Sequence, residues 1–146
     1  MPARPGEAGE GRGVLVVEEN SPDGGVYEWY RRGLSLLADG HPAAAATLLA
    51  RAAEAEPESR SLLEALGRAQ YDAGRYEDAM QTFTALIARN PTDDYAHFGL
   101  GLAANKARAL ALAAEHLALA VAMRPDVGHY TRALREVRAR RARESA

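Results

Sequence analysis

The feature that most constrains the fold of this chain is a set of landmark residues that recurs every 34 positions. Each set holds a glycine, then an alanine, then a large apolar residue, and finally a proline. The members are Gly33, Gly67 and Gly101; Ala45, Ala79 and Ala113; Leu49, Phe83 and Leu117; and Pro57, Pro91 and Pro125. A period of about 20–50 residues is typical of stacked repeats, in which each repeat covers the apolar face of its neighbour. The period therefore predicts three consecutive repeats, at 26–59, 60–93 and 94–127.

The landmark residues occupy the positions that a helix–turn–helix hairpin needs. Glycine and alanine let two helices approach closely, and proline ends a helix because it lacks an N–H group. Gly40 and Gly74 stand where a left-handed residue would follow the first helix of a hairpin. The third repeat has Arg108 at that place. We expect Asn105 to help make this bend, since asparagine tolerates the left-handed conformation; a nearly continuous helix is the alternative.

These residues resemble the tetratricopeptide repeat family. The resemblance is carried by Trp29, Gly33, Ala45, Leu49, Ala52 and Pro57 in the first repeat, and by Leu66, Gly67, Tyr71, Gly74, Tyr76, Ala79, Phe83 and Pro91 in the second. It implies an all-α fold, a right-handed α-solenoid of three helix–turn–helix hairpins, with no catalytic chemistry of its own. It also implies that the first helix of each repeat lines a concave groove.

The resemblance further implies which residues line this groove. They are Tyr27, Tyr30, Leu34 and Leu37 in the first repeat; Ser61, Glu64, Arg68, Tyr71 and Asp72 in the second; and Tyr95, Phe98, Leu102, Asn105 and Lys106 in the third. A lining that is apolar at both ends and polar in the middle favours a peptide with two apolar anchors. A clamp for a C-terminal carboxylate is not expected, because Tyr30 and Leu34 replace its polar residues. Alternatively, Tyr27 and Tyr95 only pack against neighbouring helices.

The N-terminal end has a composition unlike that of the repeats. Residues 1–25 are rich in glycine, proline and glutamate, which predicts a disordered tail because so little apolar surface can be buried. Within it, the apolar run Val14–Val17 precedes Glu18 and Glu19. This run could fold back onto the groove, with a glutamate near Arg68, or could be an incidental apolar patch.

The C-terminal end, residues 128–146, predicts a capping helix for the repeat stack. Tyr130, Leu134 and Val137 share one face at helical spacing and would pack on the last repeat. The arginines are Arg132, Arg135, Arg138, Arg140, Arg141 and Arg143. They form a solvated face in one interpretation, and a binding site for nucleic acid or an acidic partner in the other.

The composition gives little support to catalysis. The chain has no cysteine, so thiolate nucleophiles and cysteine-ligated metals are excluded. Its four histidines include no His-x-x-x-His pair, and neither a Gly-x-Ser-x-Gly motif nor a phosphate-binding loop is present. We therefore expect no catalytic residues, no metal site and no cofactor.

The charge and the N-terminus bear on location and source. A net charge of -2 and a pI near 6.1 give no overall attraction to nucleic acid or to anionic membranes. The first residues lack the apolar core of a signal peptide, and no run approaches the roughly 20 apolar residues of a membrane span. These features predict a cytoplasmic protein. Lys106 is the only lysine and alanine is abundant, which indicates a bacterial source with a GC-rich genome.

Together these observations predict an adaptor that binds a peptide segment of another protein in its groove. One alternative with the same fold is a chaperone for an exported or membrane-active protein. Another is a nucleic-acid or polyanion binder that uses the C-terminal arginines. Homo-oligomerisation through an exposed repeat end is also open.

Overall fold

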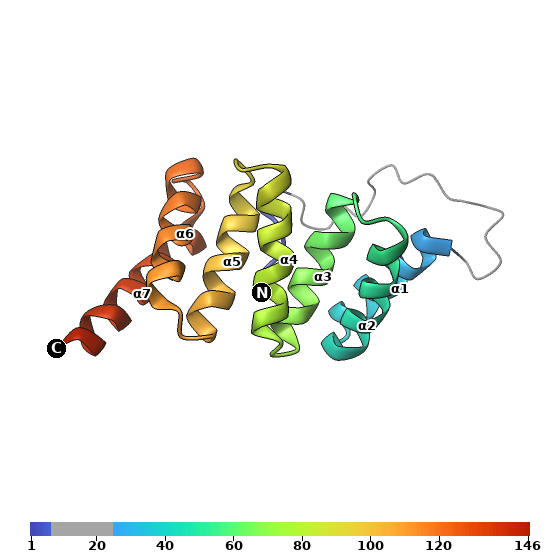
Figure 1. The fold of residues 1–146 in the computed structure, drawn as a ribbon, viewed down its shortest axis with the longest axis horizontal. Helices are drawn as coiled ribbons and strands as arrows, with labels where there is room; N and C mark the ends of the chain where they lie inside the picture. The colour runs from blue at the N-terminus through green and yellow to red at the C-terminus, as the bar shows by residue number, and fades with distance from the viewer. Residues whose placement is uncertain (7–24) are drawn as a thin grey trace. The chain divides into compact units, whose positions relative to one another are not determined.

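The computed structural model describes residues 1–6 and 25–146, and within these residues every regular element is a helix (Figure 1). The helices are α1 (Gly25–Ala38), α2 (Pro42–Ala55), α3 (Arg60–Asp72), α4 (Tyr76–Arg89), α5 (Asp94–Lys106), α6 (Leu110–Met123) and α7 (Gly128–Ser145). The predicted all-α fold class is confirmed. None of these helices is both long enough and apolar enough to cross a membrane.

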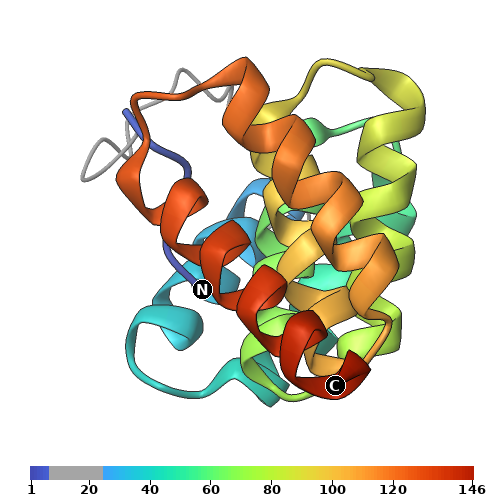
Figure 2. The same ribbon diagram turned by 90° about the vertical axis from the view of Figure 1, so that its left-hand side faces the viewer.

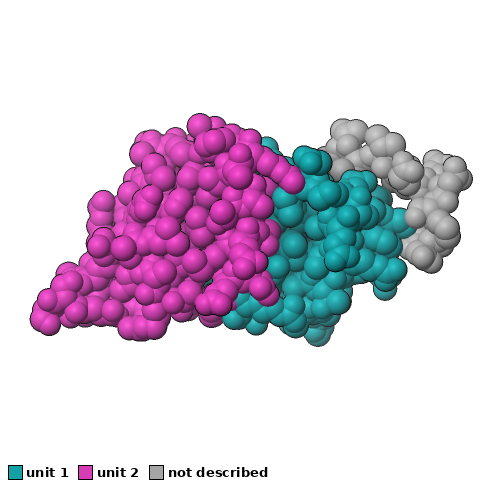
Figure 3. Space-filling view, in the orientation of Figure 1, with its two compact units in different colours: residues 1–75 teal, residues 76–146 magenta. Residues whose placement is uncertain are grey.

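The chain divides into two compact units, Met1–Arg75 and Tyr76–Ala146 (Figure 3). In unit 1, α1 and α2 pair as a hairpin and α3 packs on α2. Leu49 of α2 is fully buried and lies against Gly33 of α1. A Cβ atom at Gly33 would lie 2.5 Å from Cγ of Leu49, so the glycine is what lets these two helices approach.

Unit 2 packs α4 on α5, α5 on α6 and α6 on α7 (Figure 2). The hairpin contact of unit 1 recurs here, because a Cβ atom at Gly101 would lie 2.6 Å from Cγ of Leu117. A second glycine of α5, Gly99, lies against the ring of Phe83: a Cβ atom at this position would lie 2.5 Å from Cζ of Phe83. The core of unit 2 is the more aromatic of the two, and its largest fully buried side chains are Phe83, Tyr95, Phe98 and Tyr130.

The turns that follow α1, α3 and α5 share one conformation. Gly40, Gly74 and Arg108 are all left-handed, with φ of 84°, 80° and 68°. After each of them, the next backbone N–H donates to the carbonyl five residues earlier at 2.8 Å, from His41 to Leu36, from Arg75 to Gln70 and from Ala109 to Ala104. The third repeat therefore bends like the others. The expectation that Asn105 makes the bend was wrong: Arg108 itself is left-handed, while Asn105 stays within α5.

Side-chain caps begin the first helix of the second and third repeats. The Ser59 hydroxyl accepts a hydrogen bond from the backbone N–H of Leu62 at 3.2 Å. The Asp93 carboxylate accepts one from the backbone N–H of Ala96 at 3.1 Å. These bonds satisfy N–H groups that a helix leaves unpaired at its start, and they fix where α3 and α5 begin.

Candidate functional site

Four of the predicted groove residues lie along one stripe of α3. Successive members are spaced by four, three and one residues, which places them on the same side of two successive helical turns. They are Glu64, Arg68, Tyr71 and Asp72. The first three are half-buried and Asp72 is exposed. We call these four residues the α3 stripe.

Residues 1–6 lie on the α3 stripe. Nε and Nη2 of Arg4 donate hydrogen bonds to Oε1 of Glu64 at 2.9 and 2.6 Å. The Met1 ammonium donates to Oδ1 of Asp72. The side chains of Arg4 and Glu64 are only 11% and 13% exposed, so this ion pair is largely shielded from water.

The spacing of the two contacts suits an extended chain. Glu64 and Asp72 are eight residues apart in α3, which is about 12 Å along a helix. Three steps of extended chain, from Met1 to Arg4, cover about 10 Å. Met1 lies at the C-terminal end of α3, where cations are favoured by the helix dipole, so the segment runs antiparallel to the helix.

This arrangement changes the expectation of a disordered tail at residues 1–25. Residues 1–6 are placed on α3 because two cations meet two carboxylates, and Gly25 is already the first residue of α1. The apolar run at 14–17, together with Glu18 and Glu19, falls outside the described residues.

The predicted groove residues of α1 are half-buried. Tyr30, Leu34 and Leu37 pack against the core of unit 1. The guanidinium of Arg31 lies over the ring of Tyr27, 5.9 Å from its centroid. On the α3 stripe, Nε of Arg68 is buried and has no hydrogen-bond partner within the described residues. It is a donor that a bound carbonyl oxygen could satisfy.

Two predicted groove residues of unit 2 belong to its core instead. Tyr95 and Phe98 are 0% and 2% exposed, so assigning them to a ligand-binding surface was wrong. The ring of Phe98 lies 4.6 Å from that of Tyr130 on α7, and the ring of Tyr95 lies 6.4 Å from that of Phe83. The helix that follows the third repeat, α7, thus covers Phe98, whereas Tyr95 packs on α4. Leu102 is half-buried.

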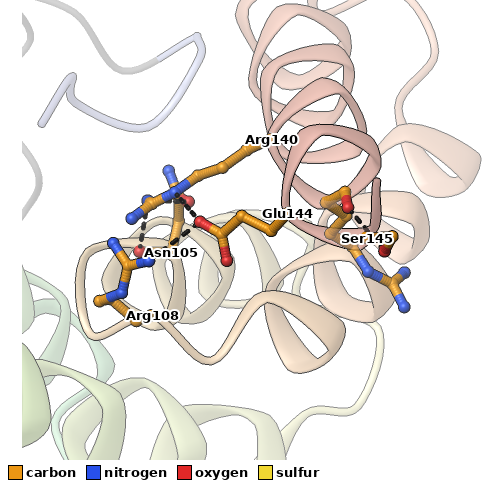
Figure 4. Close-up of polar contacts among 6 residues, drawn as sticks. Asn105, Arg108, Arg140, Glu144 and Ser145 are labelled. Atoms are coloured by element: carbon orange, nitrogen blue, oxygen red, sulfur yellow. Dashed lines mark hydrogen bonds and ion pairs between the residues drawn. The ribbon is translucent and has the colours of Figure 1, made fainter.

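The remaining predicted groove residues of unit 2 differ in their contacts. Lys106 is exposed. Asn105 binds α7, since Nη1 of Arg140 donates to its side-chain oxygen at 2.9 Å and to its backbone carbonyl at 3.0 Å (Figure 4). Glu144 joins this cluster and pairs with Arg108 at 2.9 Å and with Arg140 at 3.4 Å. Asn105 therefore holds α7 on α5.

The other predicted basic positions of α7 remain on its surface. Five arginines of this helix are exposed: Arg132, Arg135, Arg138, Arg141 and Arg143. The apolar positions Tyr130, Leu134 and Val137 are buried, so the helix has one buried face and one basic face.

Two histidines of unit 2, which the sequence analysis did not bring together, lie side by side. Nδ1 of His97 lies 2.9 Å from Nδ1 of His116, and the two rings stack at 5.1 Å. Nε2 of His97 lies 2.8 Å from the Pro91 carbonyl, which can only accept, so this nitrogen carries the proton. With its proton on Nε2, the His97 ring offers Nδ1 as an acceptor, and Nδ1 of His116 donates to it. Burial, followed by the neighbouring His97, lowers the pKa of His116.

The histidine pair is not part of a larger metal-binding set. Across residues 1–6 and 25–146, no group of three or more histidine, aspartate and glutamate side chains could hold a metal ion. A signal for the contact does exist in the sequence: the two histidines lie on the paired helices α5 and α6, near the Gly101 and Leu117 landmarks that meet there.

Comparison with known proteins gives one family and several similar folds. The sequence matches the tetratricopeptide repeat family at residues 30–94 and 65–128. MamA from Desulfovibrio magneticus RS-1 (residue 41 to the end) has a similar structure, with 23% identity over 80% of this chain and 66% of that chain and a TM-score of 0.76. This chain thus spans slightly less than two thirds of that MamA chain.

Two further structures come from RPAP3 proteins. The first such domain of human RPAP3 has 17% identity over 82% of this chain and 94% of that chain, with a TM-score of 0.76. The corresponding domain of Spaghetti (RPAP3), solved with the HSP90 peptide SRMEEVD, has 17% identity over 80% and 93%, with a TM-score of 0.74. At these identities the likeness shows the fold alone. No curated protein sequence matches this chain.

Proposed function

We propose that this chain, which belongs to the tetratricopeptide repeat family, is a non-catalytic protein-interaction module that binds an extended segment of a partner polypeptide on the α3 stripe. The observation that carries the proposal is the seating of residues 1–6 on that stripe through Glu64 and Asp72. The contacts run from Met1 to Arg4, before the turn at Pro5 and Gly6. A surface that holds such a segment of its own chain has the polar groups to hold one from another protein.

The two carboxylates of the stripe favour a cationic partner. Glu64 and Asp72 are two carboxylates within about two helical turns, and each receives a cation from residues 1–6. The peptide bound by the Spaghetti domain, SRMEEVD, is acidic toward its C-terminus. The two carboxylates of the α3 stripe would repel an acidic segment of this kind, so we expect a different ligand here.

Capture experiments with isosteric variants test this proposal. The purified chain serves as bait in a lysate of its source organism, and the captured segment is then synthesised and titrated by calorimetry. We expect Glu64→Gln combined with Asp72→Asn to lose the partner. A matched control is Glu54→Gln combined with Glu56→Gln, which removes the same charge from exposed positions of unit 1. Equal affinity of the titrated segment for the stripe variant and the control would refute the assignment.

The basic face of α7 supports a second candidate, binding of nucleic acid or another polyanion. Its five exposed arginines could neutralise several phosphates, and such binding weakens steeply as salt rises. Mobility-shift assays with single-stranded RNA, comparing the wild type with Arg135→Glu combined with Arg138→Glu, test it. RNA binding that the variant retains, or that does not respond to salt, would exclude this function.

The nature of the captured protein distinguishes the chaperone alternative from the adaptor. A chaperone for an exported or membrane-active protein would use the same stripe, and the captured protein would then be an export substrate or membrane-active protein held before folding. Identifying the captured protein by mass spectrometry separates this alternative from an adaptor that binds a folded partner through a peptide segment.

A further inference from the structure

We infer that residues 1–6 compete with a partner for the α3 stripe of their own chain. We also infer that the partner bound by the stripe presents an arginine, followed by a proline, in an extended segment. The inference rests on the proposed function and adds two elements to it. One is the chemical class of the ligand, and the other is that the site is occupied until a partner displaces the chain's own segment.

Arginine is specified by the geometry at Glu64. Two different nitrogens of Arg4, Nε and Nη2, donate to the same carboxylate oxygen at 2.9 and 2.6 Å. The ammonium of a lysine has a single nitrogen and cannot reproduce this fork. Both side chains are nearly nine-tenths buried, and charge-assisted hydrogen bonds are strongest where water is largely excluded. A partner that offers lysine at this place would bind more weakly.

Proline fixes the backbone of both anchors. Met1 precedes Pro2 and Arg4 precedes Pro5, and a residue before proline is restricted to extended conformations. The segment therefore loses little backbone freedom when it docks antiparallel to α3. The same reasoning predicts that a competing partner segment also carries proline directly after its arginine.

A competitor within the same chain sets the affinity that a partner must reach. The segment is joined to α1 through residues 7–24, and a tethered ligand acts at an effective concentration on the order of millimolar. If the segment occupies the stripe about nine-tenths of the time, the apparent affinity of a partner falls about tenfold. Releasing the segment from the stripe should raise the apparent affinity of the partner by the same factor.

Fluorescence anisotropy with the full chain tests the inference. The probe is a peptide with the sequence of residues 1–6 that carries a fluorophore after its glycine. We expect Arg4→Glu, which replaces the resident cation with a carboxylate facing Glu64, to bind the probe about tenfold more tightly than the wild type, the factor that nine-tenths occupancy gives. Arg4→Glu combined with Glu64→Gln should bind the probe at least tenfold more weakly than Arg4→Glu alone. Arg135→Glu makes the same charge change on α7 and should bind the probe as the wild type does.

Two results overturn the inference: equal probe affinity of the wild type and Arg4→Glu, or failure of Arg4→Glu to bind the probe at millimolar concentration. Circular dichroism confirms that each variant is folded, and Arg4→Gln is a milder second variant. NMR adds a direct reading, because the Nε–H signal of Arg4 should shift in Glu64→Gln if the ion pair forms in solution.

The test separates this inference from the proposed function. If the stripe variant loses a partner segment but Arg4→Glu gains no affinity for the probe, the stripe binds partners and residues 1–6 do not compete. If Arg4→Glu gains affinity for the probe but no partner depends on Glu64 and Asp72, the segment docks on the stripe and the proposed function is wrong.

Discussion

Replacing Phe98 with alanine distinguishes a core residue from a ligand contact. Phe98 is 2% exposed and lies against the rings of Tyr130, at 4.6 Å, and His129, at 5.3 Å. Truncating a buried phenylalanine lowers the free energy of unfolding by about 3–5 kcal/mol, whereas truncating a surface side chain usually changes it by less than about 0.5 kcal/mol. Since the free energy of unfolding of a domain is only about 5–15 kcal/mol, Phe98→Ala should remove a large share of it.

Thermal unfolding followed by circular dichroism measures this effect. For a chain of this length, each kcal/mol corresponds to roughly 2–4 °C in Tm, so we expect a fall of about 10 °C. Leu119→Ala is the matched control, because Leu119 is a large apolar residue of the same unit that is 38% exposed. A Tm for Phe98→Ala within about 2 °C of the wild type would refute the burial of Phe98 and return it to the candidate binding residues.

Three further predictions concern the turns, the histidine pair and the helix contacts. Arg108→Gly should be about 1 kcal/mol more stable than Arg108→Ala in urea unfolding, because both lose the side chain but only alanine has a Cβ in the left-handed conformation; equal stability would contradict this. Burial and a neighbouring imidazole lower the pKa of His116 below its ordinary 6.5, so the unfolded chain takes up a proton first. Stability present above pH 6.5 is thus lost as the pH falls below it. The fall in Tm between neutral and acidic pH should be smaller in His116→Asn than in the wild type. An unchanged fall would show that His116 is not the source of this pH dependence. Gly33→Ala should lower the unfolding free energy by about 1–3 kcal/mol, because the new methyl group would overlap Leu49; Ser35→Ala, at an exposed position of α1, is the control and should have little effect.

The repeat period predicted the helix contacts better than it predicted the exposed faces. Gly33 meets Leu49, and Gly101 meets Leu117, because the first and third hairpins keep the same spacing between a small and a large residue. The faces of α5 could not be separated in the same way, since nine of its 13 residues are buried. Helical spacing alone gives no means of choosing which apolar side faces a ligand. Of the two residues chosen, Phe98 packs on Tyr130 of α7 and Tyr95 packs on Phe83 of α4.

Two other features depended on contacts that local pattern does not encode. The left-handed conformation of Arg108 runs against its residue type, and its hydrogen bonds match those at Gly40 and Gly74 because the repeat geometry requires the turn. The docking of residues 1–6 depends on Arg4 reaching a carboxylate 60 residues away. The prolines beside Met1 and Arg4 were the one local hint that this segment is extended.

The hydrogen bonds of His97 have a consequence for how this repeat can change by mutation. His97 stands where the preceding repeat has Leu63, and His116 stands where it has Thr82. Losing His116 would leave Nδ1 of the buried His97 without its partner, which typically lowers stability by about 1–3 kcal/mol, whereas replacing both with apolar residues can be nearly neutral. The Pro91 carbonyl belongs to the backbone and is present whatever residue occupies that position. Homologues that carry His97 should therefore carry His116 as well.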